Sequence, residues 1–135
     1  MGLEMMRREK DAVMALDIVD ELERKAAQTT IEEARGAFGL NYIDIASALD
    51  VDRRTLLRYR KLLNTPVPET RERLEALRQI AFLIDEVFES REDGLRWLYQ
   101  PVPLLQGRRP VDLIRKGELN EVLSILAGLY SGSHA

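Results

Sequence analysis

Residues 42–61 read YIDIASALDVDRRTLLRYRK, and this stretch decides the fold. Two groups of apolar residues recur one helical turn apart, which predicts two short helices, each with one inward face. The groups are Ile45, Ala46 and Leu49 in the first helix, and Leu56 and Tyr59 in the second. A turn over residues 49–52 separates them, and Asp50 stands where the backbone needs a residue that tolerates positive φ. The pattern is typical of a helix-turn-helix.

The second helix of this pair is expected to carry the binding face. If Leu56 and Tyr59 face the core, the helical repeat turns the basic residues outward, as in a recognition helix in the major groove of DNA. Arginine suits that position because its planar fork can pair with a guanine edge and its charge suits phosphates. The alternative to DNA binding is that these basic residues only form a solvated surface of the helix. The predicted DNA contacts are Asp52, Arg53, Arg54, Thr55, Leu57, Arg58 and Lys61.

The composition of the chain limits which classes of protein it can belong to. The chain has 135 residues, a formal charge of −3 and no cysteine. An acidic chain can bind nucleic acid only through a local basic patch, for which we expect the stretch from Arg53 to Arg78. The absence of cysteine excludes disulfides and zinc fingers, and no apolar run is long enough to span a membrane. Together with the polar N-terminus, this favours a cytoplasmic protein without membrane contacts.

The remaining segments predict an all-α fold in three regions, 1–28, 29–65 and 66–135. An amphipathic helix is expected over residues 4–27, and Thr30 with Glu33 forms a capping-box pattern that predicts a new short helix over 31–38. After a proline-containing hinge at 64–68, helices are expected over 69–88, after a Ser90–Asp93 cap, from Pro110 to Lys116, and over 118–130. We therefore predict a helix-turn-helix followed by a small helical unit.

From residue 40 onward the chain resembles the Xre/MbcA/ParS antitoxins. One stretch that carries the resemblance is DVDRRTLLRYRKLL with the helix that follows it. The other is WLYQPVPLLQGRRPVDLIRKGELNEVLSILAGL, which resembles the toxin-binding domain of that family. The positions that fit its pattern are Trp97, Leu98, Pro101, Leu105, Gly107, Pro110, Leu113, Ile114, Gly117 and Val122. The first 40 residues contribute nothing to the resemblance.

The resemblance implies a partner and a mechanism. Such antitoxins block RES-domain toxins, enzymes that consume NAD, by placing a C-terminal segment at the entrance of the NAD pocket; here that segment is Leu126 to His134. They also bind their own operator DNA as homodimers, for which residues 4–27 or 69–88 could supply the interface. We expect Trp97 and Leu98 to belong to the core. The implied toxin contacts are Gln100, Arg108, Arg109, Leu126, Leu129, Tyr130, Ser131 and His134.

Other functions are less favoured by the residues. An enzyme is not expected, because there is no cysteine, the only histidine is His134, and no serine has an evident base. We likewise expect no metal and no cofactor. Two alternatives remain: a dimeric transcription regulator without a toxin, and a protein-binding module whose helix-turn-helix has lost its DNA affinity.

Overall fold

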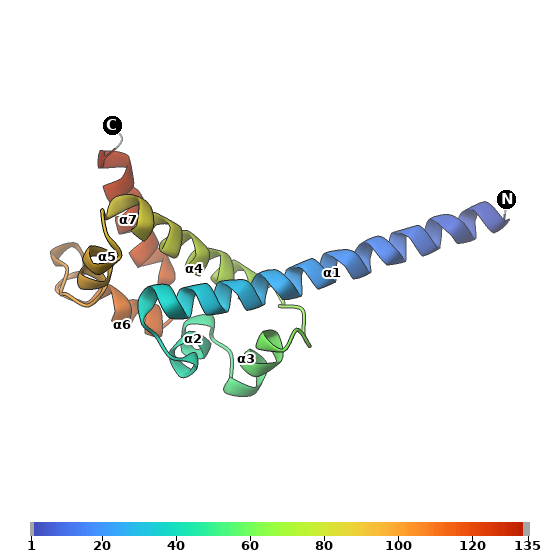
Figure 1. Cartoon of the computed structure of the whole chain (residues 1–135), viewed down its shortest axis with the longest axis horizontal. Coiled ribbons are helices and arrows are strands. Elements are labelled where there is room, and N and C mark those ends of the chain that lie inside the picture. The colour runs from blue at the N-terminus through green and yellow to red at the C-terminus, as the bar shows by residue number, and fades with distance from the viewer. Residues whose placement is uncertain (1, 134–135) are drawn as a thin grey trace.

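The computed structural model describes residues 2–133, and all regular structure in this range is helical. Figure 1 shows a body of short helices from which one long helix projects. The elements are α1 (Gly2–Phe38), α2 (Tyr42–Leu49), α3 (Arg53–Arg60), α4 (Pro68–Val87), α5 (Arg91–Leu98), the 3-10 turn η1 (Pro103–Leu105), α6 (Pro110–Arg115) and α7 (Leu119–Ser133). This confirms the predicted all-α class.

Helix α4 is the centre of the body, and it packs chiefly against α7 and α1. Leu77 and Ile80 are fully buried on it, and the helix forms where one was predicted, over residues 69–88. Pro68 is the first residue of the helix. A backbone N–H at this position would have no partner within the helix, so proline costs no hydrogen bond there. The predicted cap of α5 is also confirmed, because the Ser90 hydroxyl accepts a hydrogen bond from the backbone N–H of Asp93 at 3.1 Å.

Helices α2 and α3 form at the two positions predicted for short helices, with a turn between them. Asp50 has φ of 56° and ψ of 45°, the left-handed conformation that the turn requires. The side chain of Asn41 caps α2 by accepting from the N–H of Asp44 at 2.8 Å. Helix α1 supports α3 from behind, where the Gln28 amide donates to the carbonyl of Arg60 at 2.8 Å.

The predicted new helix at Ile31 is wrong, because α1 runs without a break from Gly2 to Phe38. Thr30 does not cap a helix; its side chain is buried against the body, and only 9% of the residue is exposed. Neither glycine nor proline occurs between residues 3 and 35 of α1, so nothing near Thr30 stops the helix. The helix ends where predicted, at Gly39, whose φ is +65°. A regional boundary after residue 28 therefore falls inside a continuous helix.

The first half of α1 has no contact with the core. Every residue from 2 to 22 is exposed, whereas Ala27, Thr30, Ile31, Ala34 and Phe38 are buried further along the same helix. At 1.5 Å per residue, this exposed part, which we call the arm (residues 2–22), is about 30 Å long. No helix within residues 2–133 is both long and apolar enough to cross a membrane.

Candidate functional site

The outward face of α3 is basic, as predicted. Arg53, Arg54, Leu57 and Arg58 are exposed, and so is Lys61 just after the helix. Leu56 and Tyr59, at 2% and 3% exposure, anchor the opposite face in the core. The two buried residues fix the rotation of α3, and this rotation sends the basic side chains to one outer surface.

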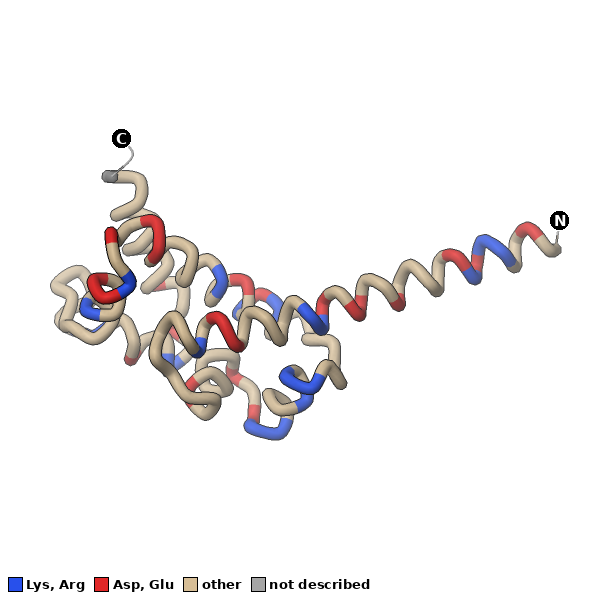
Figure 2. Tube along the Cα trace, in the orientation of Figure 1, with Lys and Arg blue, Asp and Glu red and all other residues tan. Residues whose placement is uncertain are grey.

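The charges on this face are not neutralised by the chain itself. In the range 2–133, Arg53, Arg54, Arg58 and Lys61 form no salt bridge, so their positive charge is available to an anion. Figure 2 shows the basic residues gathered along α3. A face of this kind matches the electrostatic pattern of a DNA-binding helix.

The basic patch is narrower than the predicted stretch from Arg53 to Arg78. Beyond α3, Arg71 pairs with Glu23 at 2.7 Å and Arg78 pairs with Glu75. Arg73 points inward and donates to the carbonyls of Ala48 and Gly117. The prediction was too broad because sequence shows the arginines but not the acidic or carbonyl partners that the fold brings to them.

Two of the predicted DNA contacts have a structural role. The carboxylate of Asp52 caps α3 by accepting from the backbone N–H of Thr55 at 2.7 Å. This hydrogen bond, with the nearby Arg54 charge, holds the pKa of Asp52 below its ordinary value of 3.8. The cap fixes the start of α3 and hence the positions of Arg53 and Arg54.

Arg60 belongs to a polar cluster that sequence analysis missed. Its guanidinium carbon lies 3.5 Å from the ring centre of Tyr42, and its Nε lies 3.4 Å from Glu32. Burial alone would raise the pKa of Glu32, but the hydrogen bonds from Tyr42 and Arg60 outweigh it and lower that pKa. The cluster ties α3 to α1 and α2. Arg60 therefore differs from its neighbours, since its charge is already compensated.

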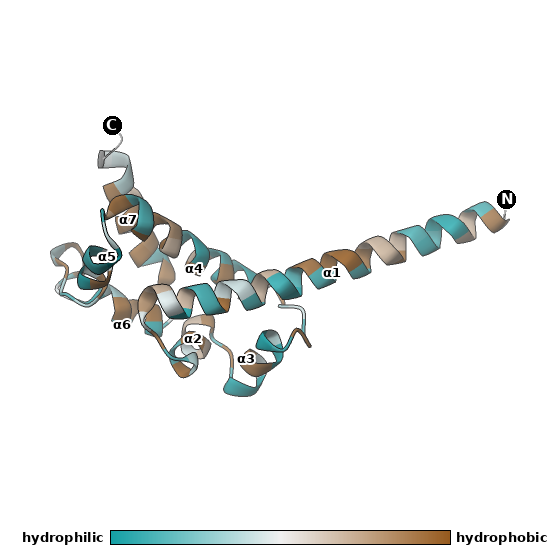
Figure 3. Cartoon of the chain, in the orientation of Figure 1, coloured by the Kyte–Doolittle hydropathy of each residue, from teal (hydrophilic) through white to brown (hydrophobic). Residues whose placement is uncertain are grey.

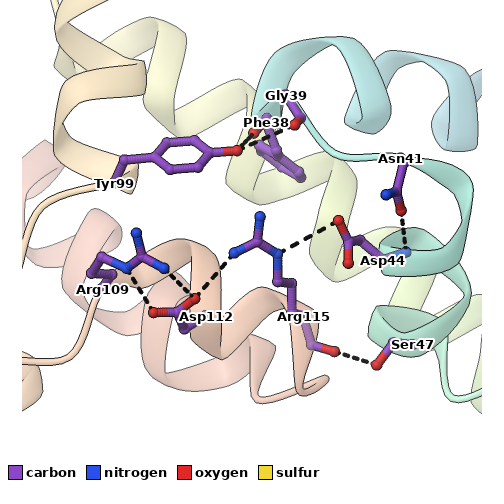
Figure 4. A network of polar contacts seen from close by, with 9 residues as sticks. All are labelled: Phe38, Gly39, Asn41, Asp44, Ser47, Tyr99, Arg109, Asp112 and Arg115. Carbon is purple, nitrogen blue, oxygen red and sulfur yellow. Dashed lines mark hydrogen bonds and ion pairs between the residues drawn. The ribbon is translucent and has the colours of Figure 1, made fainter.

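A second candidate surface is the loop between α5 and α6, which holds Gln100, Arg108 and Arg109. Gln100 is exposed. Arg108 pairs with Glu121 at 2.8 Å and Glu118 at 3.5 Å, at the start of α7. Arg109 forms two hydrogen bonds with Asp112, at 2.7 and 2.9 Å (Figure 4). Hydrogen bonding from Arg109 lowers the pKa of Asp112 despite partial burial. Both arginines therefore fix the loop to the body.

The other predicted toxin contacts lie at the far end of α7. Figure 1 shows the end of α7 extending beyond the helices around it. Leu129 and Ser131 are exposed there and Tyr130 is half-buried, whereas His134 lies outside the described residues. The nine steps from Glu121 to Tyr130 correspond to about 14 Å along the helix. The predicted residues thus form two clusters on the C-terminal unit, not one.

Leu126 was predicted as a toxin contact, and the structure contradicts this. Its side chain is fully buried among the core residues, so it holds α7 on the body and offers no surface to a partner. Sequence analysis grouped it with Leu129 because the family resemblance implies that the whole segment from Leu126 to His134 contacts the toxin. Because the two residues are only three positions apart on one helix, the sequence did not show that one of them faces the core and the other the surface.

The Leu126→Ala variant is therefore expected to lose stability. The cavity and the lost apolar burial should lower the free energy of unfolding by about 2–5 kcal/mol, measured by urea denaturation. The control is Leu104→Ala, because Leu104 is 76% exposed and its truncation should change stability by about 0.5 kcal/mol or less. Equal stability of the two variants would contradict the assignment of Leu126 to the core.

A polar seam joins α2 and the end of α1 to the C-terminal unit. Arg115 on α6 lies 3.5 Å from Asp44 on α2, and its carbonyl accepts a hydrogen bond from Ser47 (Figure 4). The Tyr99 hydroxyl donates to the carbonyl of Phe38 at 2.7 Å, which holds the end of α1. These contacts join residues more than 60 positions apart, so no local pattern could have indicated them.

Comparisons with known proteins agree with this arrangement. Residues 85–132 match the family model described as the antitoxin Xre/MbcA/ParS C-terminal toxin-binding domain. The chain is 30% identical to the probable mycobacterial cidal antitoxin Rv3188 of Mycobacterium tuberculosis, over 84% of this chain and 96% of that protein. It is 29% identical to the mycobacterial cidal antitoxin MbcA of Mycobacterium bovis, over 77% of this chain and 91% of that protein.

A solved structure shows the same likeness in three dimensions. The crystal structure of the M. tuberculosis MbcT–MbcA toxin–antitoxin complex contains a chain that is 28% identical to this one. The match has a TM-score of 0.56 and covers 78% of this chain and 94% of that chain. These relatives are thus matched over nearly their whole length, while a fifth of the present chain has no counterpart in that structure.

Proposed function

Since the chain belongs to the Xre/MbcA/ParS family of antitoxins, which are not enzymes, we propose that it neutralises a RES-type toxin that consumes NAD. Direct binding is the proposed mechanism. The observation that carries this proposal is the nearly full-length match to antitoxins, one of them in a complex with its toxin. The chain would act as a binding partner of the toxin and needs no catalytic group of its own.

The end of α7 is the proposed contact with the toxin. It lies within the matched toxin-binding domain, and it presents Leu129 and Ser131 at an exposed helix end. An apolar side chain at such an end can enter a pocket, while the ordered turns below it keep the entropy cost of binding low. Gln100, Arg108 and Arg109 would form a second contact, at the opposite end of α7.

We also propose that the chain represses its own operon through α3. Four basic side chains on the outer side of α3, none of which has a salt bridge within residues 2–133, support DNA binding. Phosphate contacts would supply affinity, and arginine forks in the major groove would read the bases. A homodimer would place two copies of α3 about 34 Å apart and would require a palindromic operator.

The test of this function is co-expression with the product of the neighbouring gene. We expect the two proteins to purify together and cellular NAD to stay at the level of cells without toxin. Cells that express the neighbouring gene alone should lose NAD, and this serves as the control. No co-purifying partner, together with sequence-specific DNA binding by the chain alone, would instead identify a transcription regulator without a toxin.

A further inference from the structure

A groove opens between the start of α2 and the outer side of α3. It measures about 390 Å³. Ile43 on α2 and Leu57 on α3 both line it, and 53% and 41% of these residues are exposed. Leu56 also lines the groove, although only 2% of it is exposed. The apolar part of the groove therefore comes from both helices, and not from a single exposed leucine.

One wall of the groove is held in place by the body. The ring centre of Tyr42 lies 3.5 Å from the guanidinium carbon of Arg60 and 4.6 Å from that of Arg35. The Tyr42 hydroxyl donates a hydrogen bond to Glu32 at 2.8 Å. Tyr42 and Arg60 both line the groove. The wall is thus formed before a partner arrives, which lowers the entropy cost of binding.

The surroundings of Leu57 are strongly basic. Its neighbours on the helix surface, three and four positions away, include Arg53, Arg54 and Lys61, all exposed. None of these three has a salt bridge within residues 2–133. Figure 3 shows a hydrophobic stretch within the otherwise hydrophilic α3. An occupant of the groove must therefore present an apolar group with negative charge around it.

DNA that contains thymine meets both requirements. Its phosphates are the negative charges, and the 5-methyl group of thymine is the apolar group that base pairs display in the major groove. We infer, on the basis of the proposed repression through α3, that Leu57 and Ile43 bind the methyl group of an operator thymine. The neighbouring arginines contact guanine and phosphate on either side of it. Leu57 is thereby a residue that determines which operator sequence the chain binds.

The spacing on α3 also sets where this thymine lies. Side chains three or four positions apart on a helix have Cβ atoms about 5–6 Å apart. Neighbouring bases on one DNA strand are spaced by about 3.4 Å along the axis. In each half-site, the thymine should therefore lie within about two base pairs of the guanine that Arg53 or Arg54 contacts.

The experiment titrates the full chain against DNA from upstream of its own gene, prepared once with thymine and once with uracil throughout. Uracil lacks only the 5-methyl group, so every phosphate and every hydrogen-bonding group is kept. One buried methyl group corresponds to about 4-fold in affinity, so two half-sites should make wild-type binding to the uracil DNA weaker by about 10- to 20-fold. Uracil at single positions should reproduce the loss only at the thymines beside the contacted guanines.

The Leu57→Ala variant tests which side chain contacts the methyl group. It should bind thymine DNA more weakly than the wild-type chain does, and it should no longer distinguish thymine from uracil DNA. The Ile43→Ala variant should reduce the same difference. Both residues are exposed, so both variants should fold. The control is Leu104→Ala, a matched substitution on η1 at a residue that is 76% exposed, and it should keep the full wild-type difference.

Equal affinity of the wild-type chain for the two DNAs would overturn the methyl contact and leave repression through α3 standing. A difference that survives in Leu57→Ala would overturn it too, since another residue would then contact the methyl group. If the chain binds neither DNA, the proposed repression and the methyl contact both fall. If the methyl group has no effect but Leu57→Ala lowers the mass of the free chain in light scattering, the groove belongs to a contact between two copies.

Discussion

Replacing Arg54 and Arg58 with glutamate is expected to abolish binding to operator DNA. Both side chains are exposed on α3, and neither has a salt bridge in the described chain that could compensate the loss. In a dimer the double variant removes four cationic contacts and places four carboxylates against phosphates. We expect operator affinity to fall at least about 100-fold in a mobility-shift titration, given the energy of single base contacts. Toxin binding should be unchanged, because α7 lies elsewhere.

The matched control for this prediction is the Arg96→Glu/Lys116→Glu variant, which changes the net charge by the same amount. Arg96 pairs with Asp93 on α5, and Lys116 is an exposed residue after α6. The control should bind the operator nearly as well as the wild-type chain, and wild-type binding should weaken steeply as salt rises. Equal losses in both variants would mean that net charge, and not α3, governs binding. Unchanged affinity of the α3 variant would contradict the orientation proposed for this helix.

Removing the residues after Ala127 is expected to release toxin activity. The truncation deletes the exposed end of α7, including Leu129 and Tyr130, but keeps Leu126, which is fully buried in the core. The shortened chain should therefore fold and still bind the operator. Loss of the residues at the centre of an interface commonly weakens binding by 100-fold or more. Cells that co-express the toxin with this chain should lose NAD at nearly the rate of cells without antitoxin.

The control for the truncation removes the same number of residues from the other end, residues 2–9. These belong to the exposed arm, so the toxin contact is left intact. This variant should keep cellular NAD at its normal level. If the chain ending at Ala127 also preserved NAD, inhibition would have to come from another surface, for which the loop around Arg108 would be the next candidate.

The parts of the fold that were predicted correctly depend on neighbouring residues. Asp50 marks the turn because its conformation is a local property, and Ser90 with Asp93 forms a cap within one turn. The capping pattern at Thr30 was misleading for a related reason. It has the local residues of a helix start, but the core on one side of α1 buries Thr30 and keeps the helix continuous. At Thr30, packing against the core therefore determined the structure, and the local capping pattern did not.

The candidate site could be predicted only in part. The rotation of α3 followed from Leu56 and Tyr59, so the outward residues were identified correctly. The state of their charges could not be inferred, since Arg71 finds Glu23 and Arg108 finds Glu121 only when distant segments meet. Leu126 and Leu129 look alike in sequence, and only the packing of α7 on α4 separates a core residue from a surface residue.

The seam between α2 and α6 has a consequence for any assembly in which both proposed partners are bound. Arg115 forms a salt bridge with Asp44 across this seam. The side chain of Arg73 donates hydrogen bonds to the carbonyls of both Ala48 and Gly117. Helix α2, and α3 beside it, are therefore held at a fixed place relative to the C-terminal unit, although residues 61–67 form the only direct chain connection from α3 to α4. A toxin held by α7 would stand at a set distance and angle from the DNA axis. The spacing of adjacent operators would then decide whether neighbouring toxin molecules fit beside one another or collide.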